Sequence, residues 1–224
     1  MRATLAKDGG PKTRTAPWPK VGPRFGDEEL AMLKEALGQN TLFYTLGKMT
    51  DRLLDRMKTI TGAPYAVACS SGSAAIHGAV KAAGVGPGDD VVAAPITDAG
   101  GLVGIVYEGA RPVFADVDPE TWSVTPATIE AALTPKTRAV LVVHLIGNPV
   151  DIEAVADLCR RRGVVLIEDC AHAFFGTAAG RPVGGWGDYA IASMTKFFPA
   201  LFVIIPYCVI INLISDKVLY IVNN

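Results

Sequence analysis

The fold is decided by two stretches of the chain, Ala139-Val140-Leu141-Val142-Val143-His144-Leu145 and Val164-Val165-Leu166-Ile167-Glu168-Asp169. Each contains a continuous apolar run of strand length, which is typical of a strand buried on both faces of a parallel sheet. A helical pattern at residues 151–162 lies between them. A strand, a helix and a second strand in this order are the unit from which parallel sheets are built.

Short apolar runs and helical segments alternate in the same way from residue 65 to residue 193. This alternation predicts an α/β fold, a three-layer αβα domain with a mostly parallel sheet. Amphipathic patterns predict two earlier helices, from Asp27 to about Leu37 and from Thr50 to Ile60. The expected strands cover residues 65–69, 91–95, 112–116, 139–145, 164–168 and 189–193, and the expected later helices cover residues 73–83, 100–108, 126–133 and 151–162.

The two ends of the chain differ from this middle part. Residues 1–25 carry several proline and glycine residues, so we expect an extended arm with little regular structure. Residues 201–224 contain no Gly, Ala, Arg or Glu, and six of these 24 residues are isoleucine, against nine in the 200 before them. We therefore expect one large domain over residues 1–200, followed by an apolar tail of foreign composition.

The apolar tail allows two further interpretations. The 18 residues from Phe197 to Ile214 are mostly apolar, which is near the lower limit of length for a membrane-spanning helix. Pro206 interrupts this run and no basic flank orients it, so a membrane anchor is the less favoured interpretation. Because the tail is rich in Ile, Val and Tyr, it also suits a β-hairpin or an aggregation-prone segment.

Net charge and cysteine spacing exclude several classes of function. A formal net charge of −1 gives no electrostatic support for binding to nucleic acid or to an anionic membrane. The four cysteines form no Cys-x-x-Cys pair and the three histidines show no metal-ligand spacing, so we expect neither a metal site nor a disulfide framework. Since no apolar secretory signal follows Met1, we expect a cytoplasmic protein.

Candidate functional residues follow the predicted strands. Ser70-Ser71-Gly72-Ser73 opens a predicted helix, where free backbone N–H groups can bind a phosphate. Gly72 would allow close approach and Ser73 would add a hydroxyl group; the alternative is an ordinary serine N-cap. Asp169 ends a buried strand, at the edge where open α/β sheets bind ligands. A carboxylate there needs a partner such as a protonated pyridine nitrogen, and a helix N-cap or a buried salt bridge is the alternative.

Two further polar side chains are candidates for the same site. His172 follows Asp169 by three residues and could reach the same ligand, although a core histidine with a backbone partner is the alternative. Lys196 follows the strand predicted at residues 189–193 and precedes Phe197-Phe198. Apolar surroundings favour the neutral, nucleophilic form of an amine, as Schiff-base formation requires. A solvated surface lysine is the alternative.

Together these segments resemble the DegT/DnrJ/EryC1/StrS family of pyridoxal-phosphate-dependent sugar aminotransferases over roughly residues 20–198. The phosphate turn of that family is similar to Cys69-Ser70-Ser71-Gly72-Ser73. Its pyridine-binding strand end is similar to Glu168-Asp169-Cys170-Ala171-His172, and its lysine segment to Ser193-Met194-Thr195-Lys196. Thr97-Asp98 occupies the segment in which many members place an aromatic residue over the cofactor ring.

The resemblance implies a type I aminotransferase fold, pyridoxal 5'-phosphate as cofactor and a homodimer with shared active sites. It implies that Lys196 is catalytic, forming a Schiff base with the cofactor and moving a proton, while Asp169 faces the pyridine nitrogen. Lysine rather than histidine at this position favours transamination over the related dehydratase reaction. The implied cofactor-binding residues are Gly72, Ser73, Thr97, Asp169, His172, Ser193 and Lys196.

The implied reaction transfers an amino group from glutamate or glutamine to a keto-sugar, often nucleotide-linked, or to a cyclitol. Two alternatives stay open, because the glycine-rich turn expected after the lysine and the small C-terminal domain are not found in these 224 residues. The chain would then be a catalytically inactive fragment of such an enzyme. A membrane-tethered domain without enzymatic activity is the third interpretation, and only the apolar tail favours it.

Overall fold

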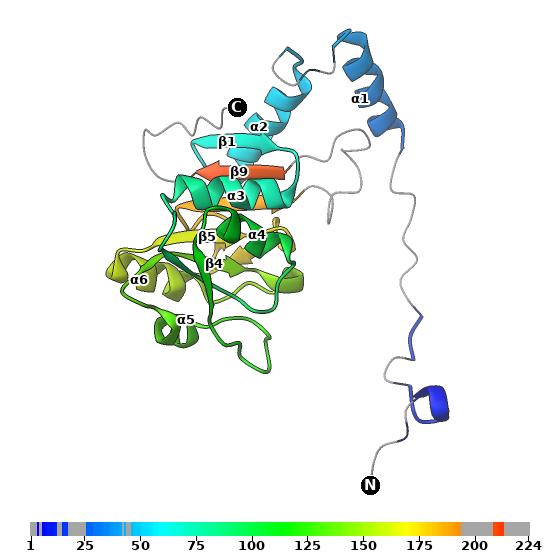
Figure 1. The fold of residues 1–224 in the computed structure, drawn as a ribbon. Helices are drawn as coiled ribbons and strands as arrows, with labels where there is room; N and C mark the ends of the chain where they lie inside the picture. Colours follow the sequence, from blue (N-terminus) through cyan, green and yellow to red (C-terminus); the bar gives the residue numbers. More distant parts are fainter. Residues whose placement is uncertain are drawn as a thin grey trace.

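The computed structural model describes residues 4, 6–12, 15–17, 26–41, 43, 46–193 and 208–212. A seven-stranded sheet forms the centre of the molecule, with the strand order β1-β9-β8-β5-β4-β2-β3 (Figure 1). A separate two-stranded hairpin joins β6 to β7. The strands are β1 (Tyr65–Cys69), β2 (Asp90–Ala93), β3 (Arg111–Phe114), β4 (Thr137–Val143), β5 (Val165–Asp169), β6 (Thr177–Ala178), β7 (Arg181–Pro182), β8 (Tyr189–Ser193) and β9 (Cys208–Asn212).

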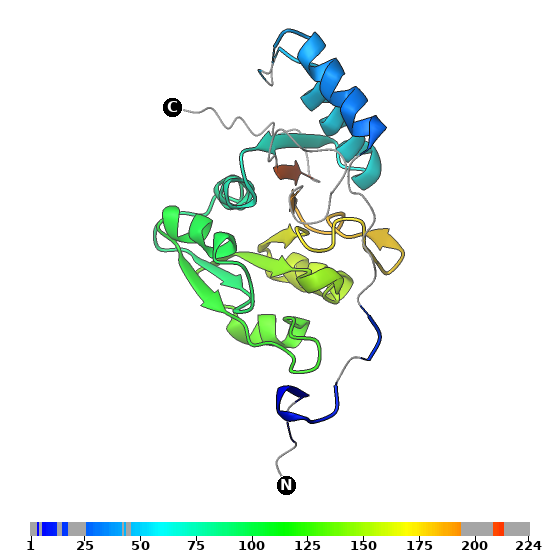
Figure 2. The same cartoon turned by 90° about the vertical axis from the view of Figure 1, so that its right-hand side faces the viewer.

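Helices cover both faces of this sheet. Figure 2 shows α3 and α4 on one side of the strands and α6 on the other. The expected three-layer α/β fold is therefore confirmed. The helices are α1 (Asp27–Gly38), α2 (Met49–Thr61), α3 (Gly72–Ala82), α4 (Gly100–Tyr107), α5 (Pro126–Ala132) and α6 (Ile152–Arg162), with short 3-10 turns at η1 (Ala6–Asp8) and η2 (Leu145–Gly147).

Successive side chains along a strand point to opposite faces of the sheet, which explains why the core has two layers. Leu141 and Ile167 belong to a buried cluster with side chains of α3 and α4, whereas Val140 and Leu166 belong to a second cluster with side chains of α5 and α6. All four are at most 2% exposed. Burial of each such side chain contributes about 1.5–3 kcal/mol, which is why the sequence shows continuous apolar runs here.

The strands run mostly parallel, as expected. β5 pairs in parallel with β4 and β8, and β2 pairs in parallel with β4 and β3. β9 is antiparallel to both of its neighbours, β1 and β8, so β1 and β8 run in the same direction. The carboxyl ends of β1, β2, β4, β5 and β8 therefore meet at one edge of the sheet.

The strand β9 comes from the apolar tail. Asn212 aligns with Tyr65 of β1 and with Tyr189 of β8, and in the described part of the chain β1 reaches the other strands only through β9. Residues 208–212 thus form a strand, as the composition of the tail suggested, but it is an inner strand between β1 and β8. No helix among the described residues is long and apolar enough to span a membrane. The expected foreign origin of the tail stays a prediction.

Most element boundaries lie within two residues of those expected. Gly62 ends α2 in a left-handed conformation with a φ of 72°. The largest difference is β4, which begins and ends two residues earlier than expected, because the chain turns at His144 into η2. The described residues of the arm before α1 contain only the short turn η1, and α1 itself buries no side chain.

Candidate active site

The residues expected to form the site lie at the carboxyl edge of the sheet. Gly72 and Ser73 follow β1, Thr97 follows β2, and His172 follows β5. Asp169 and Ser193 are the last residues of β5 and β8. In open α/β sheets this edge is where ligands bind. Lys196 lies outside the described residues, so its position relative to Asp169 is not described.

The N-terminus of α3 offers unpaired backbone donors at this edge. Ser71 is the N-cap residue, and its side-chain oxygen accepts a hydrogen bond from the N–H of Ala74 at 3.1 Å. The serine N-cap that the sequence left as an alternative is therefore present at Ser71. The amide groups of Gly72 and Ser73, in the first turn, have no acceptor within the helix and can bind an anion in addition.

The loop after β2 packs closely against this helix start. A Cβ atom placed on Gly100 would lie 2.2 Å from Oγ of Ser73, and one on Gly101 would lie 2.9 Å from Oγ1 of Thr97. The absence of side chains at Gly100 and Gly101 leaves room for Ser73 and Thr97, so both residues lie against the start of α4. Asp98, whose role the sequence left open, accepts a hydrogen bond from the N–H of Gly100 at 2.9 Å and so holds the loop.

Asp169 and Ser193 face the same side of the sheet. Asp169 aligns with Ile191 of β8, and Ser193 lies two residues farther along that strand, a rise of about 7 Å. Ile167 and Ile191 belong to the cluster under α3, and side chains two residues apart on a strand share a face. Asp169 and Ser193 therefore point toward the side of the sheet that α3 covers, where they are 6% and 5% exposed.

The Asp169 carboxylate is held by the chain that follows it. Its Oδ1 accepts a hydrogen bond from the N–H of Ala171 at 2.9 Å. A carboxylate this deeply buried is costly unless it is hydrogen-bonded or paired with a cation. A protonated ring nitrogen would be a suitable cation at this position, and the assignment of Asp169 to such a nitrogen stays a prediction.

His172 is oriented from the neighbouring strand connection. Its Nδ1 accepts a hydrogen bond from the backbone N–H of Ile146, at 3.4 Å. Since Nδ1 is the acceptor in this hydrogen bond, a neutral imidazole would carry its proton on Nε2. Ile146 was not among the expected site residues, and only the following Gly147 hints in the sequence at an unusual turn.

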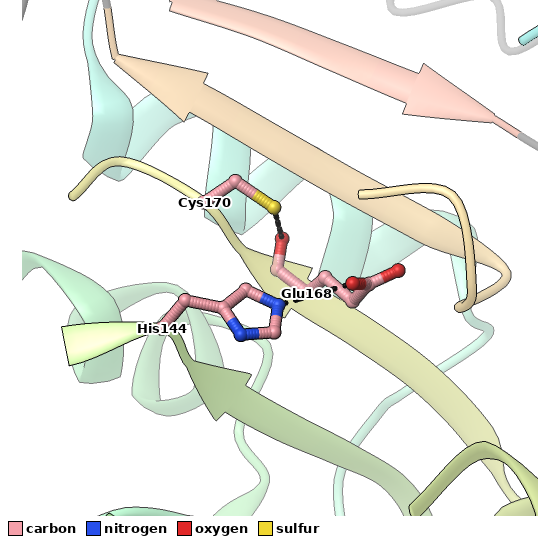
Figure 3. Close-up of side chains that lie close together, drawn as sticks. All are labelled: His144, Glu168 and Cys170. Atoms are coloured by element: carbon pink, nitrogen blue, oxygen red, sulfur yellow. Dashed lines mark hydrogen bonds and ion pairs between the residues drawn. The ribbon is translucent and has the colours of Figure 1, made fainter. Parts of the chain in front are cut away.

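A second histidine lies in a buried cluster that the sequence did not predict. Figure 3 shows His144, Glu168 and Cys170 close together, and Nε2 of His144 lies 3.0 Å from the Glu168 carboxylate. These three residues are the candidate metal ligands among the described residues. The Cys170 thiol points to the Glu168 carbonyl oxygen, and burial raises its pKa well above the usual value, which disfavours the thiolate that binds metals.

The Glu168 carboxylate has no capacity left for a metal ion. One oxygen accepts hydrogen bonds from the N–H groups of Trp186 and Gly187, and the other from the N–H of Gly184 and from His144. His144 in turn accepts the N–H of Val150 at its Nδ1. We therefore interpret the cluster as a hydrogen-bonded network rather than as a metal site.

The sheet is mostly parallel, and a helix N-terminus and a buried carboxylate lie at its carboxyl edge. These features define the class of open α/β domains that bind their ligands at this edge. Comparison with known families is more specific. The chain belongs to the DegT/DnrJ/EryC1/StrS aminotransferase family, whose model matches residues 23–201. The resemblance expected from the sequence is thereby confirmed.

Individual relatives and a solved structure are similar to most of this chain. A Micromonospora echinospora protein named as an L-glutamine:3-amino-2,3-dideoxy-scyllo-inosose aminotransferase is 37% identical over 190 residues, which are 84% of this chain and 45% of that protein. A pleiotropic regulatory protein of Geobacillus stearothermophilus is 42% identical over 156 residues, which are 70% and 41% of the two chains. The crystal structure of an aminotransferase from Psychrobacter cryohalolentis has a TM-score of 0.78 at 31% identity, covering 88% of this chain and 49% of that one. The chain thus spans less than half the length of the curated relatives it matches.

Proposed function

We propose that this chain carries the cofactor-binding domain of a pyridoxal-phosphate-dependent aminotransferase. The reaction would move an amino group from glutamate or glutamine to a keto-sugar or a cyclitol. The observation that carries the proposal is the buried Asp169 carboxylate, which shares one face and one edge of the sheet with Ser193 and with the N-terminus of α3. Pyridoxal phosphate carries a phosphate and a basic ring nitrogen, and this edge offers a partner for each.

Each residue has a distinct task in this proposal. The amides of Gly72 and Ser73, with the hydroxyl groups of Ser73 and Ser193, would bind the phosphate, next to the loop that carries Thr97. Asp169 would keep the ring nitrogen protonated, so that the bound cofactor acts as an electron sink. His172 would donate from Nε2 to the hydroxyl side of the ring. Lys196 would attach the cofactor covalently and transfer a proton at the substrate carbon that carries the amino group.

The amino acceptor is proposed from the relatives. The Micromonospora echinospora protein is named for glutamine as donor and an amino-dideoxy-inosose as acceptor, which is a cyclitol ketone. A homodimer with shared sites and a cytoplasmic location complete the proposal. The homodimer is proposed from the family resemblance, and the cytoplasmic location is proposed from the sequence.

The test is an absorbance titration of the purified chain with pyridoxal phosphate, followed by borohydride reduction and peptide mapping. We expect a new absorption band in the near-ultraviolet to visible range and a reduced adduct on Lys196. The Lys196→Ala variant is the control and should form no stable adduct. An assay with glutamine or glutamate and a keto-cyclitol then separates an active enzyme from an inactive cofactor-binding fragment. The absence of any spectral change in the wild-type chain would contradict the proposal.

A further inference from the structure

Glu168 is the most completely buried acidic side chain next to the proposed site. Its side chain is 0% exposed, and its two oxygens accept four hydrogen bonds at distances from 2.6 to 3.0 Å. Three of the donors are backbone N–H groups of the turn at residues 184–187. A carboxylate only accepts hydrogen bonds, so its ionised form suits all four donors.

This network connects three segments that reach the carboxyl edge. Glu168 directly precedes Asp169 on β5, and the turn at residues 184–187 leads through Asp188 into β8, which ends in Ser193. His144, at the end of β4, donates from Nε2 to Glu168, and its backbone N–H donates to the Asp169 carbonyl oxygen at 3.1 Å. Figure 3 shows His144, from the end of the neighbouring strand β4, pointing to the Glu168 side chain, and the Cys170 thiol pointing to the Glu168 carbonyl oxygen.

The turn at residues 184–187 packs so closely against β5 that there is no room for a side chain at Gly187. A Cβ atom on Gly187 would lie 2.8 Å from the carbonyl oxygen of Leu166, and Gly184 has a φ of +82°. The backbone therefore lies directly on β5, and its amide groups have the Glu168 carboxylate as their acceptor. Without that carboxylate, buried N–H groups would lack partners, which is costly.

We propose that Glu168, supported by His144, is a positioning residue of the cofactor site. It fixes the turn at residues 184–187 against β5, and thereby sets the position of Ser193 relative to Asp169. The proposal rests on the proposed function, because it concerns the two residues assigned to the ring nitrogen and the phosphate. Glu168 itself acts indirectly, through the backbone of the turn at residues 184–187.

The substitution Glu168→Gln tests this with almost no change of volume. Glutamine has one acceptor oxygen and one NH2 group, so whichever way the amide is turned, two of the four donors lose their acceptor. The matched control is Asp90→Asn. Asp90 is 2% exposed and accepts hydrogen bonds from Arg111 and Thr134, but it begins β2 at the opposite edge of the sheet.

Two measurements are made on each variant of the 224-residue chain, well below its unfolding temperature. The first is backbone hydrogen exchange, which we expect in Glu168→Gln to become faster at residues 184–193 by about tenfold or more beyond any change in β2 and β4, whereas Asp90→Asn should show no such local excess at residues 184–193. The second is the dissociation constant for pyridoxal phosphate, which we expect to rise by about tenfold or more in Glu168→Gln and to stay within about twofold of the wild type in Asp90→Asn.

The proposal is overturned if Glu168→Gln leaves both quantities unchanged, or if Asp90→Asn weakens cofactor binding equally, since a general loss of stability would then explain the effect. Should Glu168→Gln fail to fold, His144→Phe removes one of the four donors to Glu168, together with the Nδ1 acceptor of the Val150 N–H, and should raise the dissociation constant in the same direction by a smaller factor; no change would reject the proposal. If the wild-type chain binds no pyridoxal phosphate, the proposed function fails, and the hydrogen-exchange result alone decides whether Glu168 fixes the turn.

Discussion

Ile146 donates its backbone N–H to Nδ1 of His172 from a left-handed backbone conformation, with φ of 51° and ψ of 35°. A β-branched residue rarely adopts this conformation, which costs roughly 1–2 kcal/mol. The Ile146 side chain is 76% exposed, so burial does not offset the cost. Strain of this kind next to a proposed ligand site indicates that the turn is held in place to orient His172.

We expect Ile146→Gly to raise the free energy of unfolding by about 0.5–1 kcal/mol. Glycine removes the left-handed penalty, and its greater freedom in the unfolded chain offsets part of the gain. Urea denaturation measures the difference. Ile146→Ala is the control, because alanine keeps the Cβ atom and so keeps the penalty. An equal gain in the alanine variant would show that the left-handed conformation is not the source of the strain.

A second prediction concerns the pH dependence of stability. Hydrogen bonds from Arg111 and Thr134 hold the pKa of Asp90 below its ordinary value of 3.8, with a further contribution from Lys136. Because the folded-state pKa is the lower one, the stabilisation is fully present above about pH 4 and is lost as the pH falls through the lowered pKa. Asp90→Asn should therefore destabilise the chain by about 2–3 kcal/mol at neutral pH, and by less below pH 4.

Chemical denaturation at neutral pH and at about pH 3 gives both values. The control is Asp157→Asn, since Asp157 forms an exposed ion pair with Arg160 on α6 and its loss should change stability by less than about 1 kcal/mol. A destabilisation by Asp90→Asn that is the same at both pH values would contradict the assignment.

The contact between α3 and α4 gives a third prediction. A Cβ atom on Gly104 would lie 2.7 Å from Cα and 2.9 Å from the backbone nitrogen of His77. Backbone atoms cannot turn aside, so Gly104→Ala must push the two helices apart. We expect a loss of about 1–3 kcal/mol in the free energy of unfolding, measured by urea denaturation. A variant as stable as the wild type would mean that the helices are not in this close contact.

Gly100→Ala should behave differently, although it lies at the start of the same helix. The added methyl group meets Oγ of Ser73, a hydroxyl group that can rotate away at small cost in stability. We therefore expect an unfolding free energy within about 1 kcal/mol of the wild type, but weaker binding of pyridoxal phosphate, by about tenfold, because the Ser73 hydroxyl is displaced. Unchanged affinity would remove Ser73 from the phosphate site.

The sequence predicted the strands and helices well because their apolar periodicity is strong. It also predicted that Asp169 and the turn before α3 share an edge of the sheet, since parallel strands bring their carboxyl ends together. The pairing of His144 with Glu168 was not predictable, because 24 residues separate them and only the register of β4 on β5 brings them together. The sheet strand at residues 208–212 was suggested only by its composition.

Other features had no local signal in the sequence. The left-handed conformation of Ile146 contradicts the preference of its residue type, so no propensity could indicate it. Asp98 was noted only for the aromatic residue it replaces, whereas the structure gives it a backbone hydrogen bond at the start of α4. The catalytic assignment of Lys196 stays a prediction, because this residue lies outside the described part of the chain.

The most direct test of the central claim combines Lys196 with Asp169. Pyridoxal phosphate is added to the wild-type chain and to Asp169→Ala, the absorbance is recorded, and borohydride reduction is followed by peptide mapping. The account predicts a reduced adduct on Lys196 in the wild-type chain, with binding weakened by about tenfold or more when the Asp169 carboxylate is removed. An adduct on another lysine, or equal binding by both chains, would contradict it.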